Sequence, residues 1–315
     1  LLLALKSLNL KKKHEVIIPG MSYISTGLCA ALNNNKIIFA DIDDDTGLIS
    51  FESIKKNISK NTKVVIPVNL YGQKVDIKLL RKIVGKRVFI IEDSAQSHFS
   101  SSCHDCNSAD HSSCFKREKS HKYADLSCYS FYPSKNLGAY GDAGCIITND
   151  DELAEKARMF ANHGALIKHE HHIEGINSRL DGLQAAILSV KLKYIEQWTK
   201  LRIDRAEHYN ALFSELENIK TPKIHPGSKH VFHLYVIQVE KREELQKYLK
   251  ESGIASAVHY PVPLPFMKAY EYLEYSYNDF PQIYEAHLKI LSLPMFPELT
   301  NDEIEFIVNK ILSFD

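Results

Sequence analysis

Two segments of the chain contain residues that could do chemistry together. Lys135 lies in Tyr129–Gly138, which is otherwise apolar, aromatic and punctuated by Gly and Pro. Burial in such surroundings lowers the pKa of an amine, and a neutral amine can condense with an aldehyde. Asp93 follows the apolar run Arg87–Ile91, where a carboxylate could keep a pyridine nitrogen protonated. The pair predicts an enzyme that uses pyridoxal phosphate.

Alternating strands and helices are expected to position these residues. In the first 150 residues, β-branched runs such as Lys36–Ala40 and Lys63–Val68 alternate with helical patterns such as Ile77–Val84. Apolar strands separated by helices are typical of an α/β fold with a largely parallel sheet covered on both faces. Ligands bind beyond the carboxyl ends of such strands, where Asp93 is expected.

The pattern changes after a long helix, which is predicted over Ser178–Leu216 with a break near Trp198. Beyond this helix, a strand is predicted over Val231–Glu240, followed by a helix and a Pro-rich loop. We therefore expect a large cofactor-binding domain over residues 1–213 and a smaller α+β domain over residues 214–315.

Composition narrows the possible classes of function. The chain has 315 residues, 44% of them hydrophobic, which is enough for a sizeable core. Lys plus Arg and Asp plus Glu both number 39, so the charge balance does not favour nucleic acid as a partner. No apolar run has the length that spans a membrane, so no membrane association is expected. The six cysteines are expected to be reduced thiols of a cytoplasmic protein.

Two segments differ from this pattern. The opening Leu1–Leu5 reads as the second half of an amphipathic helix, and we expect the residues that precede this helix to be absent from the chain. Residues 100–122 are rich in Ser, His and Cys, which predicts a surface insertion. Their spacing fits no closed four-ligand zinc site well, so a solvated loop without metal is favoured over a zinc site. The side chains that could form such a site are Cys103, His104, Cys106, His111, Cys114 and His121.

Several blocks of the sequence resemble the DegT/DnrJ/EryC1/StrS family of nucleotide-sugar aminotransferases, in the order that the family keeps. The resemblance implies the aspartate-aminotransferase fold, known as fold type I, with a mostly parallel sheet of the seven-stranded type. It also implies a homodimer with active sites at the subunit interface. The blocks are Ile17–Thr26, Pro67–Gln73, Ile91–His98, Ser130–Gly138, Gly141–Gly144, Asn177–Asp181, His259–Pro261 and Leu291–Pro294.

The resemblance implies roles for individual residues. Lys135 matches the lysine that binds the cofactor and then moves a proton to it, and Asp93 matches the carboxylate that faces the pyridine nitrogen. Tyr23 matches an aromatic residue that stacks on the cofactor ring, with a buried core tyrosine as the alternative. Gln96 matches a side chain near the 3′-oxygen of the cofactor. Ser130 matches a ligand of its phosphate.

Further matches concern the partner subunit and the substrate. Asn177 matches a phosphate ligand donated by the partner subunit. His259 and Arg179 are candidates for binding the diphosphate of a nucleotide sugar, with a structural role as the alternative for His259. The sequence departs from the family in lacking the Gly-Thr/Ser motif before the opening helix, and in having Asn69 where many members have His.

The expected reaction transfers an amino group from an amino acid, with L-glutamate favoured, to a nucleotide-linked keto-deoxyhexose. Lys135 argues against the dehydratase branch of the family, which has histidine there. The context Tyr132–Asp142 resembles members that act on 3-keto sugars, so amination at C3 is favoured over C4. Two alternatives from other classes are a catalytically silent relative and a metal-binding module built on residues 100–122.

Overall fold

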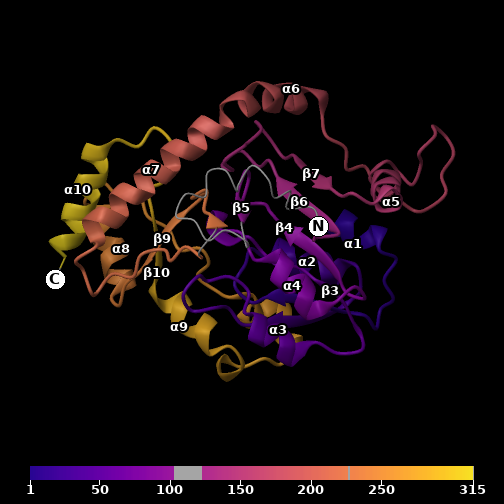
Figure 1. Cartoon of the computed structure of the whole chain (residues 1–315), viewed down its shortest axis with the longest axis horizontal. Coiled ribbons are helices and arrows are strands. Elements are labelled where there is room, and N and C mark those ends of the chain that lie inside the picture. Colours follow the sequence, from indigo (N-terminus) through magenta and orange to yellow (C-terminus); the bar gives the residue numbers. More distant parts are fainter. Residues whose placement is uncertain (103–122, 226–227, 315) are drawn as a thin grey trace.

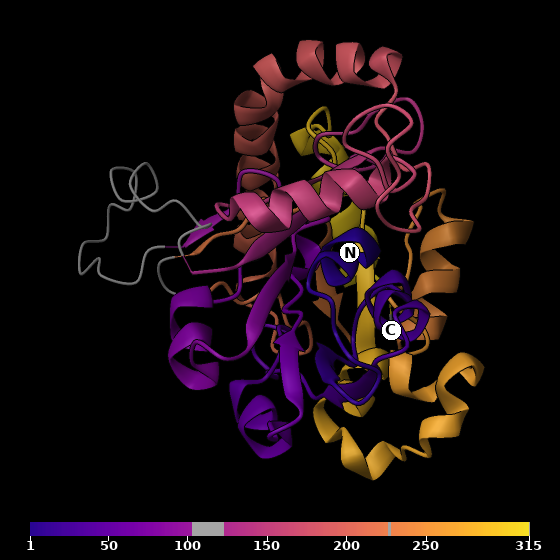
Figure 2. The same cartoon turned by 90° about the vertical axis from the view of Figure 1, so that its right-hand side faces the viewer.

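The computed structural model describes residues 1–102, 123–225 and 228–314 (Figures 1 and 2). Its central sheet has the strand order β2-β1-β3-β4-β6-β7. Strand β7 runs antiparallel to β6, and the other neighbouring strands are parallel. The predicted α/β fold with a mostly parallel sheet is confirmed, but the sheet has six strands in the described residues and not the seven that were expected. The strands are β1 (Glu15–Pro19), β2 (Lys36–Ala40), β3 (Thr62–Val65), β4 (Phe89–Asp93), β6 (Leu126–Ser130) and β7 (Gly144–Ile147).

Burial on both faces explains the composition of these strands. All five residues of β1 are buried, as are both faces of β4 over Ile90–Asp93. A strand covered on both faces needs apolar side chains on both, which produces the near-continuous apolar runs of the sequence. Helix α1 contacts α2, helix α3 contacts α4, and Figure 2 shows these two pairs on opposite sides of the sheet. The helices of this half are α1 (Leu2–Ser7), α2 (Ser25–Leu32), α3 (Phe51–Asn57), α4 (Ile77–Val84) and α5 (Asp151–Ala161).

The predicted insertion lies almost entirely outside the described residues. Of this segment, β5 (Ser101–Ser102) is described, and it pairs antiparallel with β8 (Ser228–Lys229). The side chains named for the alternative zinc site belong to residues 103–121, which are not described. Within the described ranges, no group of three or more His, Cys, Asp or Glu side chains is arranged to hold a metal ion.

The predicted long helix is present but is interrupted at a different place. It consists of α6 (Gly182–Lys191), a 3-10 turn at Leu192–Tyr194 and α7 (Ile195–Phe213), and Figure 1 shows the change of direction between α6 and α7. The break predicted near Trp198 is therefore wrong by about one turn. Trp198 lies within α7, where its ring stacks on Tyr194 and packs against a small apolar cluster, so this bulky side chain holds the helix at the bend instead of ending it.

The C-terminal half has an apolar cluster of its own, in which α7 packs against β9, β10, α8 and α10 (Figure 1). Buried side chains between residues 264 and 290 belong instead to the cluster around the central sheet. The domain boundary between residues 213 and 214 stays a prediction. The two separate clusters support it, except that residues 264–290 pack with the N-terminal half. The elements are α8 (Arg242–Glu251), α9 (Pro281–Lys289), α10 (Asn301–Leu312) and the antiparallel pair β9 (Tyr235–Gln238) and β10 (Ile290–Leu293).

Helix α9 is capped by a residue far away in the sequence. Its own N-cap residue, Phe280, provides no side-chain hydrogen bond. Instead, the Asp41 carboxylate accepts hydrogen bonds from the backbone N–H groups of Gln282 and Ile283, at 3.2 and 3.0 Å. These groups have no partner within the helix, and a carboxylate there also complements the helix dipole. The contact ties the C-terminal half to the end of strand β2.

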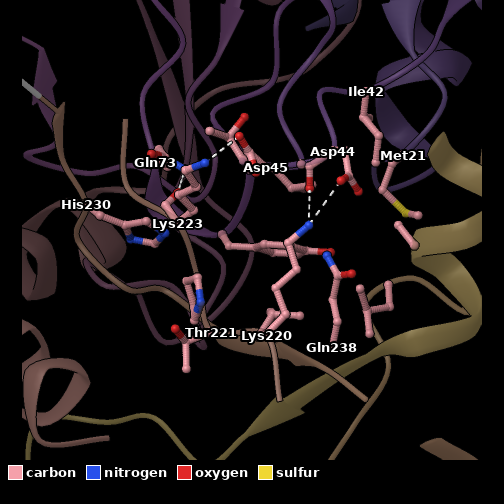
Figure 3. Close-up of a pocket in the computed structure, with 18 residues that line it drawn as sticks. Met21, Ile42, Asp44, Asp45, Gln73, Lys220, Thr221, Lys223, His230 and Gln238 are labelled. Atoms are coloured by element: carbon pink, nitrogen blue, oxygen red, sulfur yellow. Dashed lines mark hydrogen bonds and ion pairs between the residues drawn. The ribbon is translucent and has the colours of Figure 1, made fainter. Parts of the chain in front are cut away.

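Asp44 and Asp45, in the turn after strand β2, each form an ion pair with a lysine (Figure 3). Asp44 pairs with Lys220 at 3.2 Å and Asp45 pairs with Lys223 at 2.5 Å. All four side chains are at least one-third exposed, so water screens both pairs and each adds little to the stability of the fold. The pairs border a cavity of about 50 Å³, which is too small for a cofactor.

A second crossing brings the C-terminal half onto the 3-10 turn Leu70–Gly72. Val231 donates a backbone hydrogen bond to the carbonyl of Gly72 at 3.0 Å, and Leu234 donates one to the carbonyl of Tyr71 at 3.2 Å. The strand predicted from residue 231 therefore begins only at Tyr235, because residues 231–234 bond to this turn and not to a strand. Gly72 has φ +110°, and a Cβ atom there would lie 3.0 Å from two backbone nitrogens of the crossing segment.

We predict that Gly72→Ala lowers the free energy of unfolding by about 2–4 kcal/mol, because it adds both a strained positive φ and a backbone clash. Urea unfolding of the variant and the wild type measures the difference. Gly253→Ala is the matched control, since Gly253 has φ +79° and open space around it, and it should cost only about 1–2 kcal/mol. Equal losses in the two variants would contradict a requirement for the close crossing.

Candidate active site

A cavity of about 510 Å³ lies beyond the carboxyl ends of β4 and β6, where a parallel sheet is expected to bind its ligand. It is lined by side chains from both halves of the chain. Six of the eight residues predicted from the sequence line it, and they are Tyr23, Asp93, Gln96, Ser130, Lys135 and His259. The cavity therefore brings the predicted lysine and carboxylate together.

Asp93 is a buried carboxylate with fixed partners. Its side chain is 5% exposed, and it accepts a hydrogen bond from the Thr26 hydroxyl at 2.9 Å and one from the Ala95 backbone N–H at 3.2 Å. Thr26 is in turn bonded to the Ser22 hydroxyl at 2.8 Å. These contacts fix the orientation of the carboxylate, and its charge can stabilise a cationic nitrogen in the cavity.

The strand residue before Asp93 anchors this end of the sheet. Glu92 is fully buried and forms an ion pair with Lys74 at 2.6 Å, and it also accepts a hydrogen bond from Ser127 at 2.7 Å. Asn69 lies beside the pair, with its side-chain amide bonded to Ser94 at 3.0 Å. Because an unpaired buried charge is costly, removing either Glu92 or Lys74 would destabilise the end of strand β4 that carries Asp93.

Lys135 lies in a turn after β6. Its backbone N–H donates to the carbonyl of Tyr132 at 2.9 Å, and a Cβ atom on Gly138 would come within 2.3 Å of the Pro133 carbonyl oxygen, so the turn requires glycine there. Burial lowers the pKa of the Lys135 amine, and the negative charge of Asp93 partly opposes that effect. A lowered pKa makes the neutral, nucleophilic amine more available.

Tyr23 and Ser130, which were also predicted, lie at the cavity wall. The Tyr23 side chain is exposed, and the Ser130 hydroxyl can still donate a hydrogen bond. The Tyr23 side chain is 59% exposed and its ring centroid lies 5.9 Å from that of Tyr260, so the alternative of a buried core tyrosine is wrong. The Ser130 hydroxyl accepts a hydrogen bond from the Tyr132 backbone N–H at 3.3 Å. Its own proton can therefore be donated to an anion in the cavity.

Gln96 and His259 are held by one tyrosine. The backbone N–H of Tyr71 donates to the Gln96 side-chain oxygen at 2.6 Å, and the Tyr71 hydroxyl donates to the carbonyl of His259. The other end of the Gln96 amide donates to the Tyr260 hydroxyl at 3.0 Å. The His259 ring bonds to Ser292 at 2.8 Å. These contacts join the two halves of the chain across the cavity.

Asn177 and Arg179 are not part of this cavity. Both are exposed, and the Arg179 guanidinium donates to the Asn177 side-chain oxygen at 3.0 Å. Arg179 lines a different cavity of about 700 Å³ beside β7 and α5. The prediction that Asn177 serves the site of a partner subunit agrees with this position, whereas Arg179 lines a cavity other than the one that Lys135 lines.

Several residues of the site were missed by sequence reasoning. Thr26, which holds Asp93, ends the block Ile17–Thr26, which was noted without a role for the threonine. Tyr71 stands in the Asn-Leu-Tyr-Gly segment, whose importance was noted without a role for the tyrosine. Tyr260 and His98 stand in the blocks His259–Pro261 and Ile91–His98, which were noted without a role for either residue. His233 gave no signal beyond its residue type, because its proximity to Lys135 depends on contacts between distant segments.

The donor set fits pyridoxal phosphate. A carboxylate with fixed orientation, a half-buried lysine of lowered pKa, an exposed aromatic face and a serine hydroxyl that can donate all border one cavity. Those groups match a pyridine nitrogen, an aldehyde, an aromatic ring and a phosphate. The fold and the site define a transferase of fold type I that depends on pyridoxal phosphate.

The sequence profile of the DegT/DnrJ/EryC1/StrS aminotransferase family matches residues 1–312. The chain belongs to this family of sugar aminotransferases, and the activity and cofactor predicted from the sequence are confirmed at that level.

Three curated relatives cover most of the chain. A protein named pleiotropic regulatory protein, from Geobacillus stearothermophilus, is 40% identical over 99% of this chain and 81% of its own length. A UDP-2-acetamido-2-deoxy-3-oxo-D-glucuronate aminotransferase from Pseudomonas aeruginosa is 38% identical over 93% of this chain and 77% of its own. A dTDP-3-amino-3,6-dideoxy-alpha-D-galactopyranose transaminase from Aneurinibacillus thermoaerophilus is 36% identical over 99% and 82%.

Solved structures agree with this assignment. DesV of S. venezuelae superposes with a TM-score of 0.91 at 30% identity, over 98% of this chain and 80% of that protein. A Bacillus subtilis protein, NtdA, was solved with bound cofactor PMP, and it superposes with a TM-score of 0.86 at 30% identity over 99% and 70%.

No helix in the described part of the chain is both long and apolar enough to cross a membrane.

We predict that His98 makes the fold sensitive to acid. Burial lowers the pKa of His98 from 6.5 to about 4, so between these values the unfolded chain binds a proton that the folded chain does not. Stability is therefore lost as the pH falls through this window, by about 3 kcal/mol at most from this one residue. Urea unfolding at about pH 7 and about pH 4.5 should show a smaller loss for His98→Gln than for the wild type.

The exposed His172 provides the control. His172→Gln should lose as much stability as the wild type over the same pH range. If His98→Gln also behaves like the wild type, the imidazole of His98 is already protonated or accessible in the folded state, which would contradict the prediction.

Proposed function

We propose that the protein transfers the amino group of an amino acid, L-glutamate, to C3 of a nucleotide-linked keto-deoxyhexose, giving an amino sugar nucleotide for glycan synthesis. The observation that carries the proposal is the shared cavity of Lys135 and Asp93, in a chain that belongs to a family of sugar aminotransferases. The cavity is large enough to admit both a cofactor and a hexose ring beside it.

The names of relatives support C3 over C4. The Pseudomonas aeruginosa relative is named for a 3-oxo sugar and the Aneurinibacillus thermoaerophilus relative for a 3-amino sugar. A relative from Acidithiobacillus ferrooxidans, 33% identical, is named for amination of UDP-N-acetyl-3-dehydro-alpha-D-glucosamine at position 3. The nucleotide differs among these names, so the proposal covers UDP and dTDP sugars alike. Amination at C4 is the alternative within the same chemistry.

The residues of this chain divide the work of the reaction. When bound, pyridoxal phosphate supplies an aldehyde for the amino group and a ring that withdraws electrons. Asp93, held by Thr26, keeps the ring nitrogen cationic, and Tyr23 holds the plane of the ring. Ser130 donates to the phosphate, and Gln96 orients the ring edge. Lys135 Nζ takes the proton from the α-carbon of the amino acid and returns a proton in the second half of the reaction.

The same proposal assigns the substrate side of the cavity to His259. Burial and the nearby charge of Lys135 lower the pKa of His259, so it contacts the nucleotide sugar as a neutral hydrogen-bonding group. Arg179 lies outside this cavity, and we assign it to the diphosphate of a substrate bound by the partner subunit.

We further infer a homodimer with shared active sites. Asn177 is exposed and does not line the cavity of the cofactor residues of its own chain, as expected for a ligand donated to a partner. The loop and helix around it expose many large apolar side chains, which is unusual for a surface that faces water. These side chains are Leu166, Ile167, Ile173, Ile176, Leu180, Leu183, Val190, Leu192 and Tyr194.

A cytoplasmic location also stays part of the proposal. The cysteines that the structure describes, Cys29, Cys128 and Cys145, are all free thiols, which is typical of a reducing compartment.

A catalytically silent regulator is the second candidate. The Geobacillus stearothermophilus relative, 40% identical, is named a pleiotropic regulatory protein, and a relative from Saccharopolyspora erythraea is named a sensory transduction protein. Against this candidate, Lys135 and Asp93 keep both the residue types and the shared cavity that the chemistry requires.

We predict that the chain, supplied with pyridoxal phosphate and L-glutamate, aminates 3-keto nucleotide sugars faster than their 4-keto isomers. A panel of UDP- and dTDP-linked substrates, with the aminated carbon identified by NMR, measures the preference. Lys135→Ala should lose activity by at least about 10³-fold, because it removes the group that moves the proton. Preferred amination at C4 would overturn the regiochemistry, and no turnover with any substrate would favour the regulator.

We predict complementation between two inactive variants. Lys135→Ala and Asn177→Ala should each have little activity alone, whereas mixed dimers contain one site with an intact lysine and an intact asparagine. Unfolding and refolding an equal mixture should restore about a quarter of the wild-type activity, because half the dimers are mixed and each has one complete site. A mixture as inactive as its components would contradict shared sites.

A further inference from the structure

Tyr260 follows His259 in the chain and lines the active-site cavity together with Lys135 and Asp93. Within the described residues, its hydroxyl has one hydrogen bond, which joins it to the side-chain nitrogen of Gln96 at 3.0 Å. A phenol hydroxyl can donate one hydrogen bond and can also accept. The direction of the bond to Gln96 therefore decides what Tyr260 can still offer to a ligand.

A backbone N–H group fixes the direction of this bond. The N–H of Tyr71 donates to the Gln96 side-chain oxygen at 2.6 Å, and a backbone N–H can only donate. The oxygen of the Gln96 amide must therefore face Tyr71, which leaves its NH₂ group facing Tyr260. Because an amide NH₂ group can only donate, the Tyr260 hydroxyl is the acceptor. The proton of this hydroxyl has no acceptor in the part of the chain that the structure describes.

The backbone next to Tyr260 is held as well. The Tyr71 hydroxyl donates to the carbonyl of His259, the residue before Tyr260. The ring of His259 bonds to Ser292 at 2.8 Å, and Ser292 exchanges two backbone hydrogen bonds with Ala257, at 2.7 and 3.1 Å. Tyr260 is thus anchored both at its phenol oxygen and on the N-terminal side of its backbone, so its hydroxyl has a fixed place at the cavity wall.

The hydroxyl also keeps its proton at neutral pH. Burial raises the pKa of Tyr260 to about 12, opposed by the hydrogen bond from Gln96 and reinforced by the charge of Asp93. The group is therefore a neutral phenol with one proton left to donate. Such a donor favours an acceptor oxygen in the cavity, and a charged oxygen most of all.

The neighbours of Tyr260 indicate which oxygen this is. In pyridoxal phosphate, one edge of the ring between the nitrogen and the aldehyde carbon carries the phosphate, and the other edge carries the 3-oxygen. We have assigned the nitrogen to Asp93, the aldehyde to Lys135 and the phosphate to Ser130. Gln96 is assigned to the 3-oxygen, and the Tyr260 hydroxyl lies 3.0 Å from its amide nitrogen. The free proton of Tyr260 is therefore expected on the edge that carries the 3-oxygen.

We propose that Tyr260 is a further cofactor-binding residue, which donates its hydroxyl proton to the 3-oxygen of pyridoxal phosphate beside the second N–H of Gln96. The inference rests on the proposed function, in which the cofactor lies between Asp93 and Lys135, and it adds a residue to that site. Two donors that meet one oxygen stabilise its ionised form. Tyr71 determines through Gln96 which way both donors point.

Pyridoxamine phosphate tests this contact without any turnover, because its amine cannot condense with Lys135. Calorimetric titration compares it with 3-deoxypyridoxamine phosphate, an analogue that lacks the 3-oxygen. Tyr260→Phe should bind pyridoxamine phosphate about tenfold more weakly than the wild type, since it loses one hydrogen bond to a charged oxygen. The deoxy analogue should bind equally to both chains, because it has no oxygen for the phenol to contact. That equality would also show that the variant keeps a folded cavity.

A second variant tests the direction of the bond. 3-Fluorotyrosine in place of Tyr260 has a more acidic hydroxyl, which donates more strongly and accepts more weakly. It should bind pyridoxamine phosphate more tightly than the wild type does, at a pH at which both phenols keep their protons. Tyr272→Phe is the control, because Tyr272 is 66% exposed and does not line this cavity. It should leave the affinities for both ligands unchanged.

Three results would overturn the inference. They are an unchanged affinity of Tyr260→Phe for pyridoxamine phosphate, an equal loss of affinity for both ligands, and weaker binding by the fluorotyrosine variant. If only the affinity for a nucleotide sugar falls in Tyr260→Phe, the hydroxyl serves the substrate and the inference is likewise wrong. Failure of the proposed function would look different, because a chain that aminates no sugar could still distinguish the two pyridoxamine ligands through Tyr260.

Discussion

The structure depends on partly burying an amine while holding a carboxylate in the same cavity. Burial alone would favour a neutral Lys135, and Asp93 alone would favour its charged form, so the state of the amine is a balance of the two. The balance requires that neither side chain can turn away. Asp93 is fixed by Thr26 and a backbone N–H, and Lys135 is carried by a turn that closes on its own backbone.

Two sets of contacts fix the elements that carry Asp93 and Lys135. The fully buried Glu92–Lys74 pair fixes the strand that ends in Asp93. In addition, residues 231–234 lie across the turn that carries Tyr71, and Tyr71 itself bonds to both Gln96 and His259. One tyrosine thus connects a cofactor-side residue to a substrate-side residue. The C-terminal half completes the cavity wall and also fixes the loop beyond Lys135.

Much of this could be predicted from the sequence, and the limits have physical causes. The parallel strands were found because burial on both faces makes them continuously apolar, and Lys135 and Asp93 were found because charged residues in such segments are costly. The bend of the long helix was misplaced because Trp198 resembles a point of interruption in sequence, whereas its ring packs within the helix.

The residues that sequence reasoning missed share one property. Thr26, Tyr71 and His233 act through hydrogen bonds to residues that are 67, 25 and 97 positions away. No local pattern records such a contact, because helix and strand periodicity reflects burial and not the partner of a polar atom. Conversely, Arg179 was assigned to the substrate from its motif alone, and the structure separates it from the cavity of its own chain.

The cap that Asp41 provides to helix α9 has a consequence for how the chain can be divided. Residues 264–290 contribute side chains such as Leu264 and Ile283 to the apolar cluster around the central sheet. A polypeptide truncated after the long helix would leave the Asp41 carboxylate without its two backbone partners on α9 and would open that cluster to water. The interior of the N-terminal half is therefore completed only by residues 264–290, which follow the long helix in the sequence.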